Sequence, residues 1–250
     1  MTDTIKTYLT KIQIGAEQSF KNLSLFPLLS DYFIPFEYLT IDDAVSKDLI
    51  EVLEIRPKGS TSKYRVINKS DQMILIYEGE QVVKAGHQRN ISNSIMIPAK
   101  ERVVIPASFI KKNQSFPKIN KTRSSAKAKT SQDYLEHFAR VDSQVGALFV
   151  VNGKVAGMDC FGKSDVLEKI FMKMIESYAH DAAGMFDPKM NLKSSKAEAI
   201  NFLQMAKGAP VRTKLPVKLG TGCRLESKLY SGFALAHEDK VLRLSVVAKN

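Results

Sequence analysis

Residues 143–184, SQVGALFVVNGKVAGMDCFGKSDVLEKIFMKMIESYAHDAAG, contain both kinds of secondary structure from which we expect the chain to be built. Ser143–Val151 and Lys154–Phe161 are apolar runs joined by Asn152–Gly153, a pair typical of a two-residue β-hairpin turn. A helix is expected from Asp165 to about Ala183, because apolar residues recur there at helical spacing. A buried hairpin followed by an amphipathic helix is typical of an α+β protein.

The ends of two helices are also indicated. Ser164 is the expected N-cap of the long helix, and Gly184 is expected to end it in a left-handed conformation. A second helix fits from about Lys196 to Lys207, where Ser195 and Glu198 match a capping box. A brief helix running to about Ser46 is also expected, because Thr40 is a suitable N-cap and Asp42 and Asp43 form an acidic first turn.

Both flanks of this stretch are β-rich. Short apolar runs alternate with turn-forming residues at about 49–55, 63–68, 73–77, 91–97 and 102–108, and again at about 223–229, 232–237 and 241–248. Short polar turns between strands favour antiparallel pairing over βαβ crossovers. We therefore expect a single α+β domain over residues 1–250. It would have antiparallel, sandwich-like sheets, one long helix and one or two shorter ones.

Composition narrows the class of protein. The chain has 250 residues, of which 44% are hydrophobic, and no apolar run long enough for a transmembrane helix, so no membrane partner is expected. The N-terminus lacks a signal-peptide pattern, which predicts a cytoplasmic protein. Cys160 and Cys223 have no CxxC or histidine partners at ligand spacing, so reduced thiols and no metal site are predicted. No cofactor and no oligomeric state are indicated.

The net charge of +11 is concentrated in one segment. Residues 111–129, the basic segment, contain seven basic residues and no acidic one: Lys111, Lys112, Lys118, Lys121, Arg123, Lys127 and Lys129. Such a segment can bind the phosphates of nucleic acid by Coulomb attraction. The alternative is a flexible, solvated loop.

Three acidic residues are candidates for catalysis. Glu78 and Glu80 flank Gly79, and in a continued strand both would point to the same face. Two close carboxylates can share acid–base work or bind a cation, whereas the alternative is a charged strand end beside a glycine turn. Asp159 ends a strand shortly before the long helix, where it either caps a turn or lies at the edge of a pocket.

Four residues in the polar stretch after Glu80 are candidates for ligand binding. Arg89 can bind a phosphate or carboxylate through two parallel hydrogen bonds. Gln88 and Asn90 offer amides suited to ribose or amide groups, and Gly86 allows close backbone approach. The alternative is that these residues satisfy backbone groups of a long solvated loop. The sequence has no P-loop, no GxGxxG after a strand, no GxSxG and no HExxH.

An ordered set of short motifs resembles a known family. The motifs are Asn22–Leu23–x–x–Phe26–Pro27–Leu28, Glu78–Gly79–Glu80, Gly86–x–Gln88–Arg89–Asn90, Gln144–Val145–Gly146–Ala147, Gly153–Lys154–Val155, Asp159–x–Phe161–Gly162, Ser177–Tyr178–Ala179–x–Asp181–Ala182 and Gly232–x–Ala234–Leu235–x–His237. This set resembles the bacterial and phage domain associated with ADP-ribosylglycohydrolases and rhodanese-phosphatases, and the resemblance covers roughly residues 12–247.

The resemblance implies a place in NAD and ADP-ribose metabolism, often in phage–host conflict, and no defined reaction. The leading hypothesis is binding, with or without hydrolysis, of an ADP-ribose-like or other NAD-derived nucleotide. Arg89, Gln88 and Asn90 would bind it, and Glu78 or Glu80 would act as a general base or cation ligand with Asp159 assisting. The alternative is a non-catalytic module that binds nucleic acid or protein through the basic segment.

Overall fold

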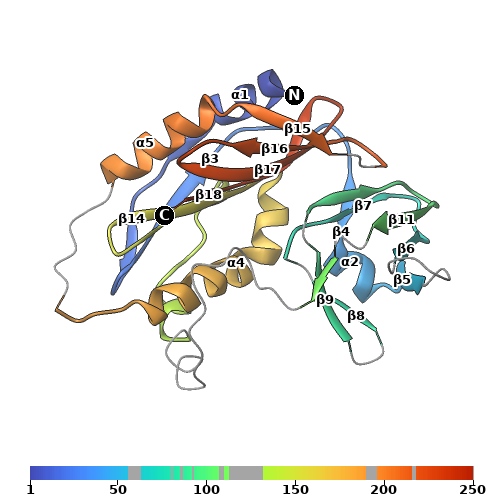
Figure 1. Cartoon of the computed structure of the whole chain (residues 1–250), viewed down its shortest axis with the longest axis horizontal. Helices are drawn as coiled ribbons and strands as arrows, with labels where there is room; N and C mark the ends of the chain where they lie inside the picture. Colours follow the sequence, from blue (N-terminus) through green and yellow to red (C-terminus); the bar gives the residue numbers. More distant parts are fainter. Residues whose placement is uncertain are drawn as a thin grey trace. The chain divides into compact units, whose positions relative to one another are not determined.

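The computed structural model describes residues 1–55, 63–79, 81–84, 87–91, 93–106, 110–112, 132–189, 196–215 and 218–249, and the chain forms two compact units (Figure 1). Unit 1 comprises Met1–Phe33, Ile119–Thr213 and Cys223–Asn250, and unit 2 comprises Ile34–Lys118 and Lys214–Gly222. Both units contain helix and strand, which confirms the predicted α+β class. The expectation of a single domain over residues 1–250 stays a prediction.

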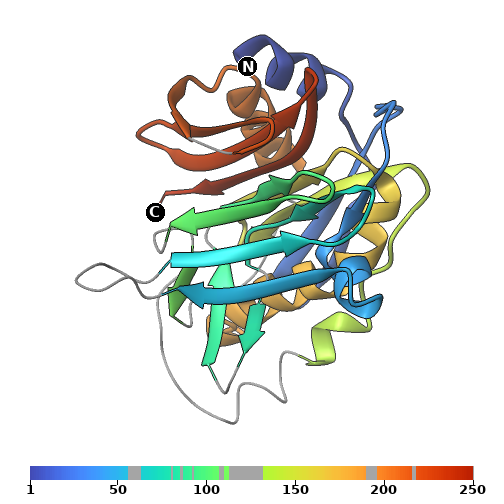
Figure 2. The same ribbon diagram turned by 90° about the vertical axis from the view of Figure 1, so that its right-hand side faces the viewer.

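The described residues of unit 2 form three sheets of three strands each, in the orders β10-β7-β4, β11-β6-β5 and β12-β9-β8. The strands are β4 (Tyr38–Thr40), β5 (Ile50–Ile55), β6 (Lys63–Asn68), β7 (Met73–Ile76), β8 (Gln81–Lys84), β9 (His87–Ile91), β10 (Ile95–Ile97), β11 (Arg102–Pro106) and β12 (Ile110–Lys112). Strands β5, β6 and β11 run side by side in Figure 2. The pairs are antiparallel, as predicted, except that β4 runs parallel to β7.

Helix α2 (Ile41–Ser46) begins at a capping box. The Thr40 hydroxyl accepts the backbone N–H of Asp43 at 3.2 Å, and the Asp43 carboxylate accepts the N–H of Thr40 at 3.0 Å. Two donors that helix geometry leaves without partners are thereby satisfied. The helix start that the sequence predicted at Thr40 is confirmed.

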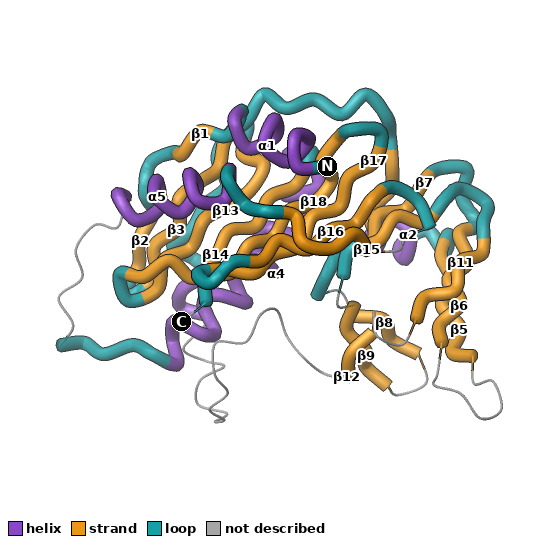
Figure 3. The backbone as a smooth tube through the Cα atoms, turned by 45° about the horizontal axis from the view of Figure 1, so that its top comes forward, coloured by secondary structure: helices purple, strands orange, loops and turns teal. Residues whose placement is uncertain are grey.

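The polar stretch after Glu78 differs from its predicted form. We expected a connection between strands followed by one β run from Ile91 to Ile97. Instead β8 and β9 form a hairpin, β9 ends at Ile91, and β10 begins separately at Ile95. The hairpin joins β12 in the three-stranded sheet seen in Figure 3. Backbone pairing does not require apolar side chains, so a polar strand such as HQRNI gives no alternation for a sequence reading to detect.

One nine-stranded sheet lies almost entirely in unit 1, in the order β1-β3-β13-β14-β18-β17-β16-β15, with β2 also paired to β3. The strands are β1 (Gln13–Ile14), β2 (Gln18–Phe20), β3 (Leu23–Leu29), β13 (Gln144–Val151), β14 (Lys154–Phe161), β15 (Val211–Leu215), β16 (Thr221–Glu226), β17 (Tyr230–His237) and β18 (Lys240–Ala248). The β13–β14 turn has Asn152 at φ 50° and Gly153 at φ 72°, as the predicted hairpin requires.

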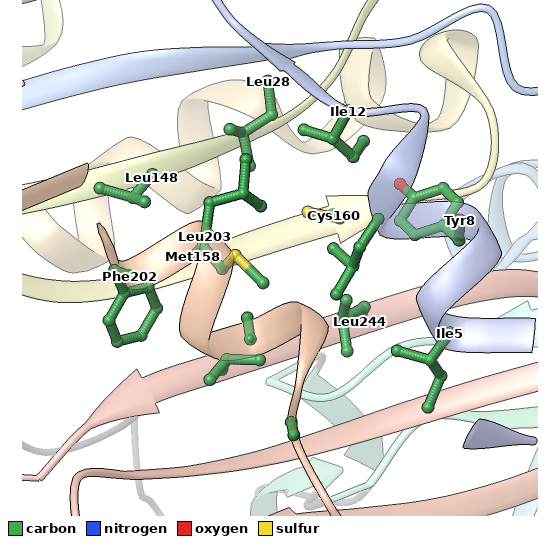
Figure 4. Close-up of a cluster of buried hydrophobic side chains, with 14 of the residues drawn as sticks. Ile5, Tyr8, Ile12, Leu28, Leu148, Met158, Cys160, Phe202, Leu203 and Leu244 are labelled. Carbon is green, nitrogen blue, oxygen red and sulfur yellow. The ribbon is translucent and has the colours of Figure 1, made fainter. Parts of the chain in front are cut away.

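Helices cover both faces of this sheet. Helices α1 (Thr2–Thr10) and α5 (Lys196–Lys207) lie on one face, and α4 (Ser164–Gly184) lies on the other (Figure 1). Side chains alternate along a strand, so each face of β14 has its own partners. Met158 and Cys160 belong to the core with Tyr8 of α1 and Phe202 of α5 (Figure 4). Each such large apolar side chain contributes about 1.5–3 kcal/mol on full burial.

The residue ranges of the helices agree with the sequence prediction more closely than the predicted capping and terminating residues do. α5 spans the predicted residues, whereas its expected cap, Ser195, lies outside the described residues. α4 begins at Ser164 itself with Lys163 as N-cap, and the Ser164 hydroxyl accepts a hydrogen bond from Arg140 instead of capping. Gly184 remains helical, so the predicted left-handed stop is wrong. In the described part of the chain, no helix has the length and apolarity to cross a membrane.

Candidate functional site

The backbone of Glu78 and Gly79 lies beside the end of β9 in unit 2. The N–H of Glu78 donates to the buried Ser94 hydroxyl at 3.0 Å. The N–H of Gly79, at φ 92°, donates to the carbonyl of Ile91 at 2.8 Å. A positive φ favours glycine, so Gly79 permits the turn that begins the hairpin. The predicted acidic residue Glu78 is thus held next to the predicted ligand-binding stretch.

The β8–β9 register places three of the predicted ligand-binding residues within one hairpin. Gln88 stands opposite Val83, Arg89 opposite Val82, and Asn90 opposite Gln81. Two further predicted residues, Glu80 and Gly86, lie outside the described residues.

Strand β12 brings the start of the basic segment to the same sheet. Lys111 stands opposite Asn90, and Lys112 stands opposite Arg89. Two stretches that the sequence marked separately are therefore neighbours across one strand pair (Figure 3). The remaining basic residues of the segment lie outside the described part of the chain: Lys118, Lys121, Arg123, Lys127 and Lys129.

Asp159 belongs to unit 1, where it forms a buried ion pair. Its carboxylate accepts hydrogen bonds from the Arg243 guanidinium and from the Tyr178 hydroxyl, the latter at 2.8 Å. The Asp159 and Arg243 side chains are only 1% and 2% exposed. Arg243 also donates to the carbonyls of Cys160 and Leu244, and it lies over the ring of Phe161 at 4.3 Å.

Burial keeps two groups near this ion pair, the Tyr178 hydroxyl and the Cys160 thiol, in their protonated forms at neutral pH. Burial raises the pKa of Tyr178 well above its ordinary value, and the adjacent Asp159 charge raises it further. Tyr178 therefore remains a hydrogen-bond donor at neutral pH, and its ring stacks on Phe149 at 3.8 Å. Burial also raises the pKa of the Cys160 thiol to about 12, which makes that cysteine a poor nucleophile.

The predicted catalytic set is thus distributed over the two units, with Glu78 in unit 2 and Asp159 in unit 1. The catalytic roles of Glu78, Glu80 and Asp159 stay predictions. No group of three or more histidine, cysteine, aspartate or glutamate residues that could hold a metal ion occurs among the described residues.

Arg243 was not singled out from the sequence, although a signal for it exists. It is the single charged residue within the apolar run VLRLSVVA of β18. An arginine in a buried strand requires a counterion, since burial of an isolated charge is strongly unfavourable. Tyr178 lies on the apolar stripe of the long helix, and the structure adds its hydrogen bond to Asp159.

The fold and these residues define an α+β protein with a charged buried core in one unit and a polar hairpin in the other. The model for the domain described as ARPP-1, ARG and Rhodanese-Phosphatase-superfamily-associated Protein domain, matches residues 11–114 and 111–247. The chain belongs to this family, which confirms the resemblance seen in the sequence. The family's association is with ADP-ribosylglycohydrolase and rhodanese-phosphatase proteins, an ADP-ribose-related context. The chain matches no curated protein and no solved structure.

Proposed function

We propose that the protein binds an ADP-ribose-like or other NAD-derived nucleotide at the β12-β9-β8 sheet of unit 2. The observation that carries this proposal is the hairpin register together with the hydrogen bond from Gly79 to Ile91. These backbone contacts place Glu78 beside a small sheet that carries Arg89, with Gln88 and Asn90 at the flanking positions of the same strand. The ADP-ribose-related context of the family supports the choice of ligand.

Each residue type suits one part of such a ligand. The guanidinium of Arg89 matches the geometry of a phosphate. The amides of Gln88 and Asn90 can both donate to and accept from ribose hydroxyls or the nicotinamide group.

Hydrolysis of the bound nucleotide is the finer part of the proposal. Glu78 or Glu80 would take a proton from the attacking water as a general base, or would hold a cation. The setting would be the cytoplasm of a bacterium, in an NAD-linked or phage–host conflict pathway.

Thermal unfolding with ADP-ribose, NAD and cyclic ADP-ribose, each with and without Mg²⁺, tests binding. A ligand at ~100 times its Kd stabilises the folded state by about 2.7 kcal/mol, which raises the Tm by several degrees. Arg89→Ala should abolish the rise, whereas Arg102→Ala, at an exposed position of β11, should preserve it. For turnover, Glu80→Gln is the corresponding variant. Unchanged binding and turnover in both Arg89→Ala and Glu80→Gln would refute the site.

The second candidate function is nucleic-acid binding through the basic segment. Its supporting observation is that seven of the chain's basic residues lie in residues 111–129 without an acidic one. Because such binding releases counterions from the phosphates, affinity for short RNA should fall steeply with salt. A flat salt response would exclude this candidate.

A further inference from the structure

The twelve residues of the β12-β9-β8 sheet include no acid. Its cationic residues are Lys84, Arg89, Lys111 and Lys112, with His87 as a further titratable group. The neighbouring β11-β6-β5 sheet of the same unit is different, since Glu51 and Glu54 of β5 accompany its basic residues. The positive charge of the first sheet therefore has no counterpart within its own strands.

The register concentrates that charge at one point. Lys112 stands opposite Arg89 across the β12–β9 pair, and Val82 stands opposite Arg89 on the other side. Opposed residues of antiparallel strands have Cα atoms only about 4.5–5.5 Å apart. Like charges at such positions repel one another, and an anion bound between them would relieve the repulsion. An anion with two charged groups suits two adjacent cations.

We propose that Lys112 and Arg89 together bind the diphosphate of the nucleotide. This inference rests on the proposed function and extends it, because it assigns Lys112 of the basic segment to the small-molecule site. The basic segment is then divided in function at the end of β12. Lys112 recognises the diphosphate, and Lys118 and the residues after it do not.

The test measures affinity by calorimetry for ADP-ribose, inorganic pyrophosphate and adenosine. Lys112→Gln should weaken ADP-ribose and pyrophosphate at least ~10-fold, a typical effect of losing one charge-assisted contact, and should leave adenosine binding unchanged. The matched control, Lys118→Gln, removes the same charge from the same basic segment and should change affinity less than ~2-fold. Lys112→Arg keeps the charge and should restore most of the affinity. A Tm equal to that of the wild type shows that each variant is folded.

The outcomes separate this inference from the proposed function. Wild-type binding of ADP-ribose with equal effects of Lys112→Gln and Lys118→Gln would overturn the diphosphate pair alone. Pyrophosphate binding that Lys112→Gln abolishes, without any ADP-ribose binding, would support the pair and overturn the nucleotide. Binding of neither ligand by the wild type would overturn both.

Discussion

The ion pair of unit 1 and the cationic sheet of unit 2 differ in how their charges are balanced. The first contains both signs of charge, and the strands of the second contain only positive charge. Asp159 and Arg243 neutralise each other inside unit 1, where Tyr178 and backbone carbonyls complete their hydrogen bonds. In the sheet of unit 2, Arg89 and Lys112 are opposed, and its three strands contain no acidic residue. Charge that a unit balances internally needs no partner from outside. Charge that its own strands leave unbalanced is the basis of the ligand proposed above.

The largest effect should follow from breaking the internal balance. Asp159→Ala leaves the buried Arg243 without its carboxylate, which should reduce the free energy of unfolding by about 3–5 kcal/mol in urea titrations. Asp31→Ala removes a carboxylate that is 86% exposed and should change it by less than about 0.5 kcal/mol. The double variant Asp159→Leu/Arg243→Met should recover most of the loss, because no buried charge remains. A loss below about 1 kcal/mol in Asp159→Ala would show that the pair is not a structural element.

A smaller effect is expected from crowding the strand beside Asp159. A Cβ on Gly146 would lie 2.3 Å from the Asp159 carbonyl oxygen and 2.9 Å from the Cys160 Cα, and backbone atoms cannot yield cheaply. Gly146→Ala should therefore lower stability by about 1–3 kcal/mol or more. Gly208→Ala, whose new Cβ meets nothing closer than 3.7 Å, is the matched control and should be near neutral. Equal stabilities of the Gly146→Ala and Gly208→Ala variants would mean that β13 and β14 can move apart at little cost in free energy.

The stability of the folded state in alkali should depend on the buried hydroxyl of Tyr178. Its pKa is raised in the folded state, so above pH 10 the unfolded chain loses a proton that the folded chain retains. The unfolded state then binds fewer protons, and stability falls as pH rises, by up to about 1.4 kcal/mol per pH unit for this group. Tyr178→Phe should show a correspondingly shallower fall between pH 10 and 12, measured by urea titration at each pH. Identical slopes would contradict the burial of the hydroxyl.

The smallest of these effects should occur in helix α2 of unit 2. Thr40→Ala removes the N-cap of α2 and should cost about 1 kcal/mol. Ser46→Ala, at the other end of the same helix, removes only an exposed hydrogen bond and serves as control. Hydrogen exchange should show the loss of protection at α2, with no change in α4 of unit 1. Loss of protection in α4 would show that the two units unfold as one.

Local signals in the sequence were sufficient for much of the fold. The bounds of α5, the Asn152–Gly153 turn and the Thr40 cap each depend on a few adjacent residues, and each is confirmed. The N-cap of α4 was mispredicted because the Ser164 hydroxyl accepts a hydrogen bond from Arg140, a residue distant in sequence, and this competes with the capping role. Strand β15 was missed because a run such as VRTKL has few apolar residues.

The candidate site depends more on distant pairing. Residues 88–90 and the basic segment were each visible as chemistry, yet their adjacency depends on the pairing of β9 with β12. Likewise, Asp159 was visible, but its partner Arg243 comes from β18, late in the chain. Composition indicates which residues can act, whereas long-range strand register decides which of them meet.

The strand order of unit 1 has a consequence for synthesis on the ribosome. β3 ends at Leu29 and pairs with β13, which begins at Gln144, and the N–H of Ser30 donates to the carbonyl of Ser143 at 3.0 Å. Nearly all of unit 2 must therefore be synthesised before β13 is available to pair with β3. Pairings between such distant segments form slowly, whereas the short-range hairpins of unit 2 can close early. During translation, the apolar strand LSLFPLL remains incompletely paired, which makes it the segment of the nascent chain that a chaperone would have most reason to hold.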